Sequence, residues 1–338
     1  MADPPLTSPA VTDGGRRRRY LVRRLGQAGV VLGLVVVLQF FLLHLAPGDV
    51  ADVIAGESQA ADPEFVSRLR QQLGLDQPLP VQLGLYAWRL VRLDFGISHA
   101  FGVPVIDLIA ERLPATLLLM VCAIATAFFA GTALGIVAAV RVGSWTDLAV
   151  SVAALLFYAT PAFLVGIGLI LVFTVQLRWL PMSGMMTPWL EGGWWAIFVD
   201  LARHLIMPVL ALALFYVAIY TRLMRAAMLE ILSLDYVRTA RAKGLRAWRV
   251  VVGHAARNAM LPMVTMLGLQ VGSLLGGAIL VETVFGWPGI GRLAFEGVSR
   301  RDVPLVLGIL SLSSVLVLLV SLAVDVVYTR LDPRIVLR

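Results

Sequence analysis

The sequence predicts an all-α integral membrane protein with six transmembrane helices. Of its 338 residues, 59% are hydrophobic and only 14% are charged, with a mean hydropathy of +0.87. Soluble domains carry about 25% charged residues. A chain with so few charges cannot cover itself with polar surface, so we expect the lipid bilayer to be its solvent. Six apolar segments are long enough to cross that bilayer, and the basic residues gather in alternate connections between them.

Each predicted membrane helix is an apolar run of roughly 20 residues or more, the length that spans a bilayer. They cover residues 27–46, 114–140, 147–175, 204–222, 261–283 and 303–328. The first follows a basic cluster, RRRRYLVRR. Because the run after that cluster is longer than a signal-peptide core and no cleavage site follows, we interpret it as a retained helix. The second and third segments exceed the bilayer thickness, and Pro161 predicts a kink in the third.

The basic residues predict the orientation of these helices. With the N-terminus in the cytoplasm, the inner segments hold 18 of the 28 basic residues. The positive-inside rule therefore predicts that both termini lie in the cytoplasm. The predicted parts are a cytoplasmic N-terminus (1–24), a first membrane helix (25–46), an extracytoplasmic loop (47–112), a five-helix core (113–329) that includes a cytoplasmic loop (223–260), and a cytoplasmic C-terminus (330–338).

The long outer loop predicts a short amphipathic helix, DPEFVSRLRQQLG. Asp62 can cap it, Pro63 suits its first turn and Gly74 can end it. This helix either rests on the membrane bundle or offers a docking surface to an external partner. A second outer loop carries Trp189, Trp194 and Trp195, which are typical of an aromatic anchor at the membrane interface.

The inner loop predicts two short helices separated by a glycine turn. Asp235 or Ser233 can cap a helix that begins at Tyr236, and Gly244 can end it in a left-handed conformation. A second helix would cover residues 247–259, and Pro262 would begin the next membrane helix. Trp248, Val251, Val252 and Ala255 would share one face of that second helix.

Several kinds of chemistry have no motif in this sequence. The only lysine, Lys243, precedes a glycine, whereas a phosphate-binding loop needs lysine after one. Four scattered histidines and one cysteine suggest no metal site. We therefore expect no enzyme, no cofactor or metal in this chain, and no nucleic-acid partner. No series of carboxylates lies at mid-membrane, as ion-coupled transporters often have.

The inner loop carries a recognisable pattern. DYVRTARAKGL, with a proline 18 residues after its glycine, resembles the EAA loop of ABC-transporter membrane subunits. Aligned on Gly244, the Glu-Ala-Ala positions are Arg238, Thr239 and Ala240. The missing glutamate resembles the version found in peptide-transporter permeases. LAPGD, LDFGIS, ERLPATLLL and ETVFGWPGIGRL are similar to other stretches of the dipeptide/oligopeptide ABC importer permease family, so the resemblance covers nearly the whole chain.

This resemblance implies an ABC type I importer permease fold, a location in a bacterial inner membrane, and a set of partners. It implies a second homologous permease subunit, an extracytoplasmic substrate-binding protein, and two cytoplasmic ATPase subunits that bind ATP and Mg. The cargo would be short peptides, although relatives also move nickel chelates, glutathione or haem. Coupling to the ATPases would involve Asp235, Tyr236, Arg238, Thr239, Ala240, Lys243, Gly244 and Leu245. Two alternatives stay open: an ion-gradient-coupled transporter that works alone, and a loop helix that merely lies on anionic lipid.

Polar and aromatic residues inside the predicted helices are candidates for lining the cargo path. They are Gln39, Tyr158, Thr160, Tyr216, Tyr220, Gln270 and Ser273. For each of them, the alternative is a hydrogen bond or packing contact between helices.

Overall fold

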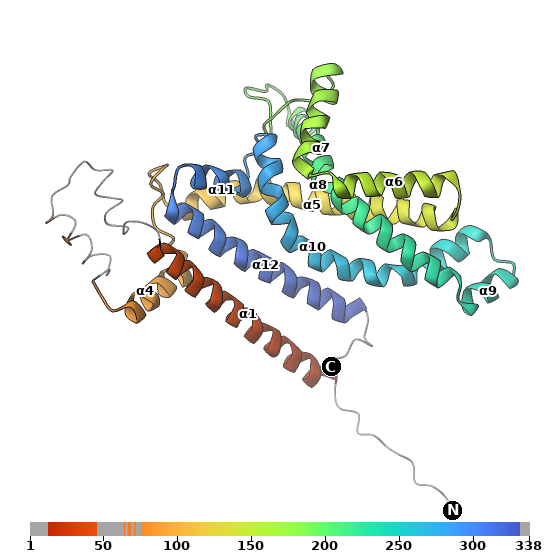
Figure 1. Ribbon diagram of the computed structural model, residues 1–338, viewed down its shortest axis with the longest axis horizontal. Helices are drawn as coiled ribbons and strands as arrows, with labels where there is room; N and C mark the ends of the chain where they lie inside the picture. The colour runs from red at the N-terminus through yellow and green to blue at the C-terminus, as the bar shows by residue number, and fades with distance from the viewer. Residues whose placement is uncertain (1–12, 46–63, 65–66, 69–70, 72–75, 332–338) are drawn as a thin grey trace, which may run out of the picture. The chain divides into compact units, whose positions relative to one another are not determined.

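The computed structural model describes residues 13–45, 64, 67–68, 71 and 76–331 (Figure 1). These residues belong to two compact units. The first unit comprises Met1–Arg89 with Ser314–Arg338, and the second comprises Leu90–Ser313. Every regular element in the described residues is a helix. Most of the predicted outer helix, including Asp62, Pro63 and Gly74, lies outside the described residues, as does the LAPGD stretch after Leu45.

The first unit contains α1 (Asp13–Leu45) and most of α4 (Leu79–Val91), a helix that the sequence analysis did not predict. Side-chain hydrogen bonds join α1 to α4. His44 Nε2 lies 3.0 Å from Gln82 Oε1, and the Tyr86 hydroxyl donates to Gln39 Oε1 at 3.4 Å. Gln39 is buried, with 2% of its surface exposed. The polar residues near the end of α1 therefore hold α4 in place.

The second unit is built around α8 (Trp194–Leu232), which contacts α5, α6, α7 and α10 (Figure 1). In chain order its elements are α5 (Val105–Val140), α6 (Trp145–Ala159), α7 (Ala162–Leu169), the π-helix η1 (Ile170–Gln176), α8, α9 (Asp235–Ala242), the π-helix η2 (Arg249–Ala256), α10 (Arg257–Val284), α11 (Ile290–Ser299) and α12 (Val303–Leu331), which crosses into the first unit. Figure 1 shows α9 and α11 at opposite ends of this unit.

The described residues agree with the prediction of six membrane segments when a bent pair of helices is counted as one span. Five helices are long and apolar enough to cross a membrane, and a bent pair of helices makes the sixth. That pair is the predicted third segment, which turns through 107° between α6 and the α7–η1 helix. The change of direction is far sharper than the predicted kink. The Thr160 amide donates to Leu156, and Pro161 has no amide hydrogen with which to continue the helix.

The observed helix boundaries differ most from the predicted ones where additional helical turns precede the apolar runs. α5 begins at Val105 instead of residue 114, because Val105, Leu108 and Ile109 pack against α11 and α12. α8 has 39 residues and is therefore about 58 Å long, well beyond a bilayer core of about 30 Å. Trp189, Trp194 and Trp195 near its start are exposed, and their interfacial role stays a prediction.

Two glycines allow α5 to approach α8 closely. A Cβ atom on Gly131 would lie 2.5 Å from Tyr220 Cβ, and one on Gly135 would lie 2.6 Å from Met224 Cβ. Neither position can hold a larger side chain unless the helices separate. The sequence GTALG is a small-xxx-small motif of the kind that brings membrane helices together. It fixes α5 against α8, the helix that leads to the inner loop.

Candidate functional site

The helix predicted in the inner loop is present as α9, but its start differs from the prediction. Asp235 is the first helical residue, Leu234 precedes it, and no side chain caps the helix. The Ser233 hydroxyl donates instead to the Glu230 carbonyl at 2.7 Å, so the proposed capping by Ser233 or Asp235 is wrong. The Asp235 carboxylate is exposed in the first turn, where its negative charge favours the positive end of the helix dipole.

Gly244 ends α9 as predicted, with a φ of +75°. The Gly244 amide donates to Arg241 at 3.0 Å, and the Leu245 amide donates to Ala240 at 3.4 Å. These two bonds form a Schellman motif, and its usual apolar contact is made by Leu245, which packs in the same cluster as Ala240. Three features thus stop the helix at one position.

The two faces of α9 have different surroundings. Val237 and Ala240 are buried with Val250 in a small cluster that also contacts Ile231 and Leu232 at the end of α8. These two residues therefore hold α9 to its own chain. The exposed face presents the remaining candidates: Asp235, Arg238, Thr239, Lys243 and Gly244. Tyr236 is partly exposed, and its hydroxyl accepts a hydrogen bond from Asn258 at 2.9 Å.

In the second half of the loop, the buried face predicted for the helix over residues 247–259 is wrong, because part of this segment is not an α-helix. Residues 249–256 form a π-helix, whose backbone hydrogen bonds join residues five apart instead of four, so each turn holds more residues than a turn of an α-helix. Val250 and Ala255 are accordingly buried, while Trp248 and Val252 are exposed, so the predicted shared face does not exist. Pro262 also does not begin the next helix, because α10 begins at Arg257 and contains that proline.

Three of the seven candidate path residues come together. The Tyr216 hydroxyl of α8 lies 3.2 Å from the Ser273 hydroxyl of α10, which is 2.9 Å from Gln270 Oε1. Ser273 is exposed, and no described atom lies within 4 Å of where a Cβ on Gly276 would stand. Tyr216 itself is buried, so this row of polar groups links two helices and is open to its surroundings at Ser273.

The other candidates are dispersed. Tyr220 is fully buried, and its hydroxyl has no hydrogen-bond partner among the described residues. Tyr158 stacks on Phe215, and the Thr160 hydroxyl donates back to Leu156 within α6. Gln39 belongs to the other compact unit, where it binds Tyr86. For Tyr158 and Gln39, the observed contacts are the contacts between helices that were the alternative to lining a path, whereas the Thr160 hydroxyl bonds only within its own helix.

The stretch ETVFGWPGIGRL connects α10 to α11, which lies at the opposite end of the unit from α9 (Figure 1), and it contains the buried Glu282. Its buried carboxylate accepts the Thr116 hydroxyl at 2.7 Å and the Arg292 amide at 3.0 Å. The Ile290 amide donates in turn to Thr116, and the Trp287 indole donates to the Ala115 carbonyl. A Cβ on Gly289 would collide with Glu282. The motif therefore builds a cap on α11 and fixes it to α5.

A second buried carboxylate organises the neighbouring loop. Asp302 accepts hydrogen bonds from the Ser98 hydroxyl, from the Ala100 amide at 3.0 Å and from the Leu305 amide at 3.1 Å. It thus caps α12 and holds the LDFGIS loop at the same time. Sequence reasoning recognised these two motifs only as a family likeness. In both cases, an acidic residue shortly before a helix, Glu282 before α11 and Asp302 before α12, is the feature that indicates a capping role.

These features define a class of protein. The fold is that of ABC importer permeases: the structure resembles one from the MetNI methionine ABC transporter in an inward-facing conformation, with a TM-score of 0.54. The likeness covers 67% of this chain and 97% of that chain, at 18% sequence identity.

The chain belongs to the family described as the binding-protein-dependent transport system inner membrane component, which it matches over residues 131–337. The N-terminal region of such components matches residues 17–120. A Brucella ovis protein provisionally named a peptide permease is 43% identical over 319 residues, covering 94% of this chain and 98% of that protein. The dipeptide transport system permease protein DppB of Escherichia coli is 39% identical over 337 residues, with the same two coverages. The chain is thus a multi-pass inner membrane protein from a family of transport components that are not themselves enzymes.

Proposed function

We propose that this chain is the membrane-spanning permease subunit of an ATP-driven importer of short peptides, forming half of the translocation pathway. Relatives at about 40% identity over 93–94% of the chain carry peptide or dipeptide permease names, and they support the cargo class. The complete complex would hold a second homologous permease, two cytoplasmic ATPase subunits and an extracytoplasmic substrate-binding protein. ATP and Mg would bind to the ATPases, and this chain would hold no cofactor.

The observation that carries the coupling role is the construction of α9. One face of this helix is buried against the end of α8, a Schellman motif stops it, and the other face is exposed. A helix so fixed can receive a push from an ATPase and pass it to α8 without bending. A helix that only rested on lipid would need an apolar face toward the membrane. In α9 that face is already covered by Val250.

The proposed orientation follows from the position of α9. If α9 meets cytoplasmic ATPases, then α11 and the Glu282 cap, at the opposite end of the unit, face outward (Figure 1). Both termini would then lie in the cytoplasm, as the arginine distribution predicts. The row formed by Tyr216, Ser273 and Gln270 lies between these ends and offers hydroxyl and amide groups to peptide bonds.

The test is purification of the chain under mild conditions from its native membrane. We expect two ATP-binding proteins and a second permease to purify with it. The partner binding protein, measured against a panel of dipeptides, tripeptides, glutathione, nickel chelates and haem, should bind peptides most tightly. A chain that purifies without ATPases and still takes up cargo would instead be an ion-gradient-coupled transporter.

A further inference from the structure

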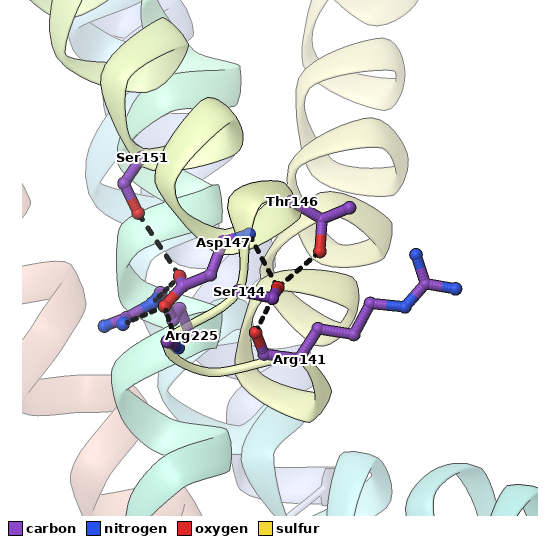
Figure 2. Close-up of polar contacts among 7 residues, drawn as sticks. Arg141, Ser144, Thr146, Asp147, Ser151 and Arg225 are labelled. Atoms are coloured by element: carbon purple, nitrogen blue, oxygen red, sulfur yellow. Dashed lines mark hydrogen bonds and ion pairs between the residues drawn. The ribbon is translucent and has the colours of Figure 1, made fainter.

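The Asp147 carboxylate, which lies outside the sites described above, joins α6 to α8 (Figure 2). Arg225 of α8 donates to Asp147 of α6 through two nitrogens, Nε at 2.7 Å and Nη2 at 2.9 Å. The Gly143 amide donates to the same carboxylate at 3.0 Å, and the Ser151 hydroxyl at 3.4 Å. Asp147 is 6% exposed. A bidentate pair of this kind fixes direction as well as distance.

α6 packs on α8 and α5 but buries few of its side chains. Among its residues only Asp147 and Ala154 are buried. Most of its large apolar side chains are exposed, including Leu148, Val152, Leu155 and Leu156. The position of α6 on the rest of the unit therefore depends on a few specific contacts.

A second contact between the same two helices lies near the other end of α6. The Tyr158 ring stacks on Phe215, with centroids 5.3 Å apart and an angle of 12° between the planes. The Arg222 guanidinium lies 5.8 Å from the centre of the Tyr158 ring. From Asp147 to Tyr158 is about 16 Å along a helix. Two attachments so far apart fix both the position and the rotation of α6 on α8.

The lower part of α8 is also the support of α9. Arg225 lies about 10 Å along the helix from Leu232, the last residue of α8. Leu232 and Ile231 then contact the buried cluster that holds α9. A continuous series of contacts thus runs from α9, through the end of α8, to the Asp147–Arg225 pair and α6.

We propose that the Asp147–Arg225 pair is a joint that makes α6 move together with the base of α8, so that displacement of α9 reaches α6. Both are positioning residues, and the inference rests on the proposed function, in which an ATPase moves α9. Apolar helix contacts can slide past each other during conformational change, whereas a bidentate ion pair keeps one geometry, and here the Gly143 amide and the Ser151 hydroxyl also hold the carboxylate in place. α6 then leads into the 107° bend before α7.

The first test needs no disruptive variant. Cys122 is the only cysteine, so Cys122→Ser gives a background for spin labels at two exposed positions, Leu155 on α6 and Val252 on η2. The labels are measured in the complete transporter, without nucleotide and with vanadate-trapped ATP. The joint predicts one narrow distance that is the same in both states. A distance that changes between the states refutes the joint.

The second test breaks the pair. With Asp147→Asn we expect a broadened label distance and uptake of tritiated dialanine per ATP hydrolysed reduced about tenfold, within the range for mutations along a coupling network. Asp147→Arg combined with Arg225→Asp should recover part of that loss. The matched control is Asp200→Asn on the same α8 helix, where the carboxylate accepts two 2.7 Å hydrogen bonds from Thr187.

The results separate three cases. If Asp147→Asn uncouples and Asp200→Asn does not, the joint is supported. If both variants leave coupling and the label distance normal while Gly244→Val uncouples, the joint is wrong and the proposed function stands. If Gly244→Val also leaves coupling normal, the role of α9 is wrong and the joint has nothing to transmit.

Discussion

Gly244→Val tests the coupling helix through backbone conformation alone. Apart from Gly244 and its two chain neighbours, no described atom lies within 4 Å of the place where a Cβ on Gly244 would stand, so an added Cβ meets no steric obstacle from the rest of the fold. The φ of +75° is a different matter, because L-residues other than glycine lose about 1–2 kcal/mol in left-handed conformations. A β-branched residue such as valine is a genuine outlier there. The substitution should therefore weaken the Schellman stop by at least that amount.

A loss of about 1–2 kcal/mol lowers the population of the capped turn by about 5- to 30-fold relative to the open one. We expect Gly244→Val to insert into the membrane normally but to transport poorly per ATP hydrolysed. The control is Gly244→Asn, because asparagine adopts the left-handed conformation more readily and should retain most coupling. Both variants are compared in proteoliposomes by uptake and phosphate release. If asparagine and valine impair coupling equally, the effect comes from side-chain bulk at an interface, and the conformational reasoning is refuted.

Three further predictions concern stability and cargo. Gly135→Ala should lower thermal stability in detergent by about 1–3 kcal/mol because its Cβ would overlap Met224, whereas Gly168→Ala, in open space on a helix, should not. Glu282→Gln should lower thermal stability in the same assay by about 1–3 kcal/mol, because both carboxylate oxygens accept hydrogen bonds and an amide offers only one acceptor oxygen. An unchanged melting temperature would show that this cap is dispensable. Because the Tyr216 hydroxyl belongs to the row with Ser273 that we propose contacts cargo, Tyr216→Phe should raise the KM for dialanine uptake without lowering stability. A loss of stability with a normal KM would instead assign the Tyr216 hydroxyl to helix packing.

The features that the sequence predicted well depend on local composition. Hydropathy runs located the membrane segments because burying apolar side chains in lipid needs no knowledge of their neighbours. Gly244 was found because only glycine readily ends a helix in that conformation. Pro161 marked the bend before α7 for a similarly local reason, the missing amide hydrogen.

The features that the sequence did not predict depend on contacts between distant residues. Asp147 and Arg225 are far apart in the chain, and each alone suggests only a charge near a helix end. Gly135 was one glycine among 30, and only the position of Met224 shows why it matters. The π-helix 249–256 changes the period within the inner loop, so Val250 and Ala255 share the buried side, and an α-helical pattern predicted the wrong face.

Uptake by the purified complex in proteoliposomes, with and without an ion gradient, tests the central claim most directly. With both permeases, the ATPases and the binding protein present, we predict dialanine accumulation that requires ATP and Mg on the ATPase side and continues when proton and sodium gradients are abolished. Accumulation driven by either gradient, in vesicles that contain this chain but no ATPase, would contradict the account.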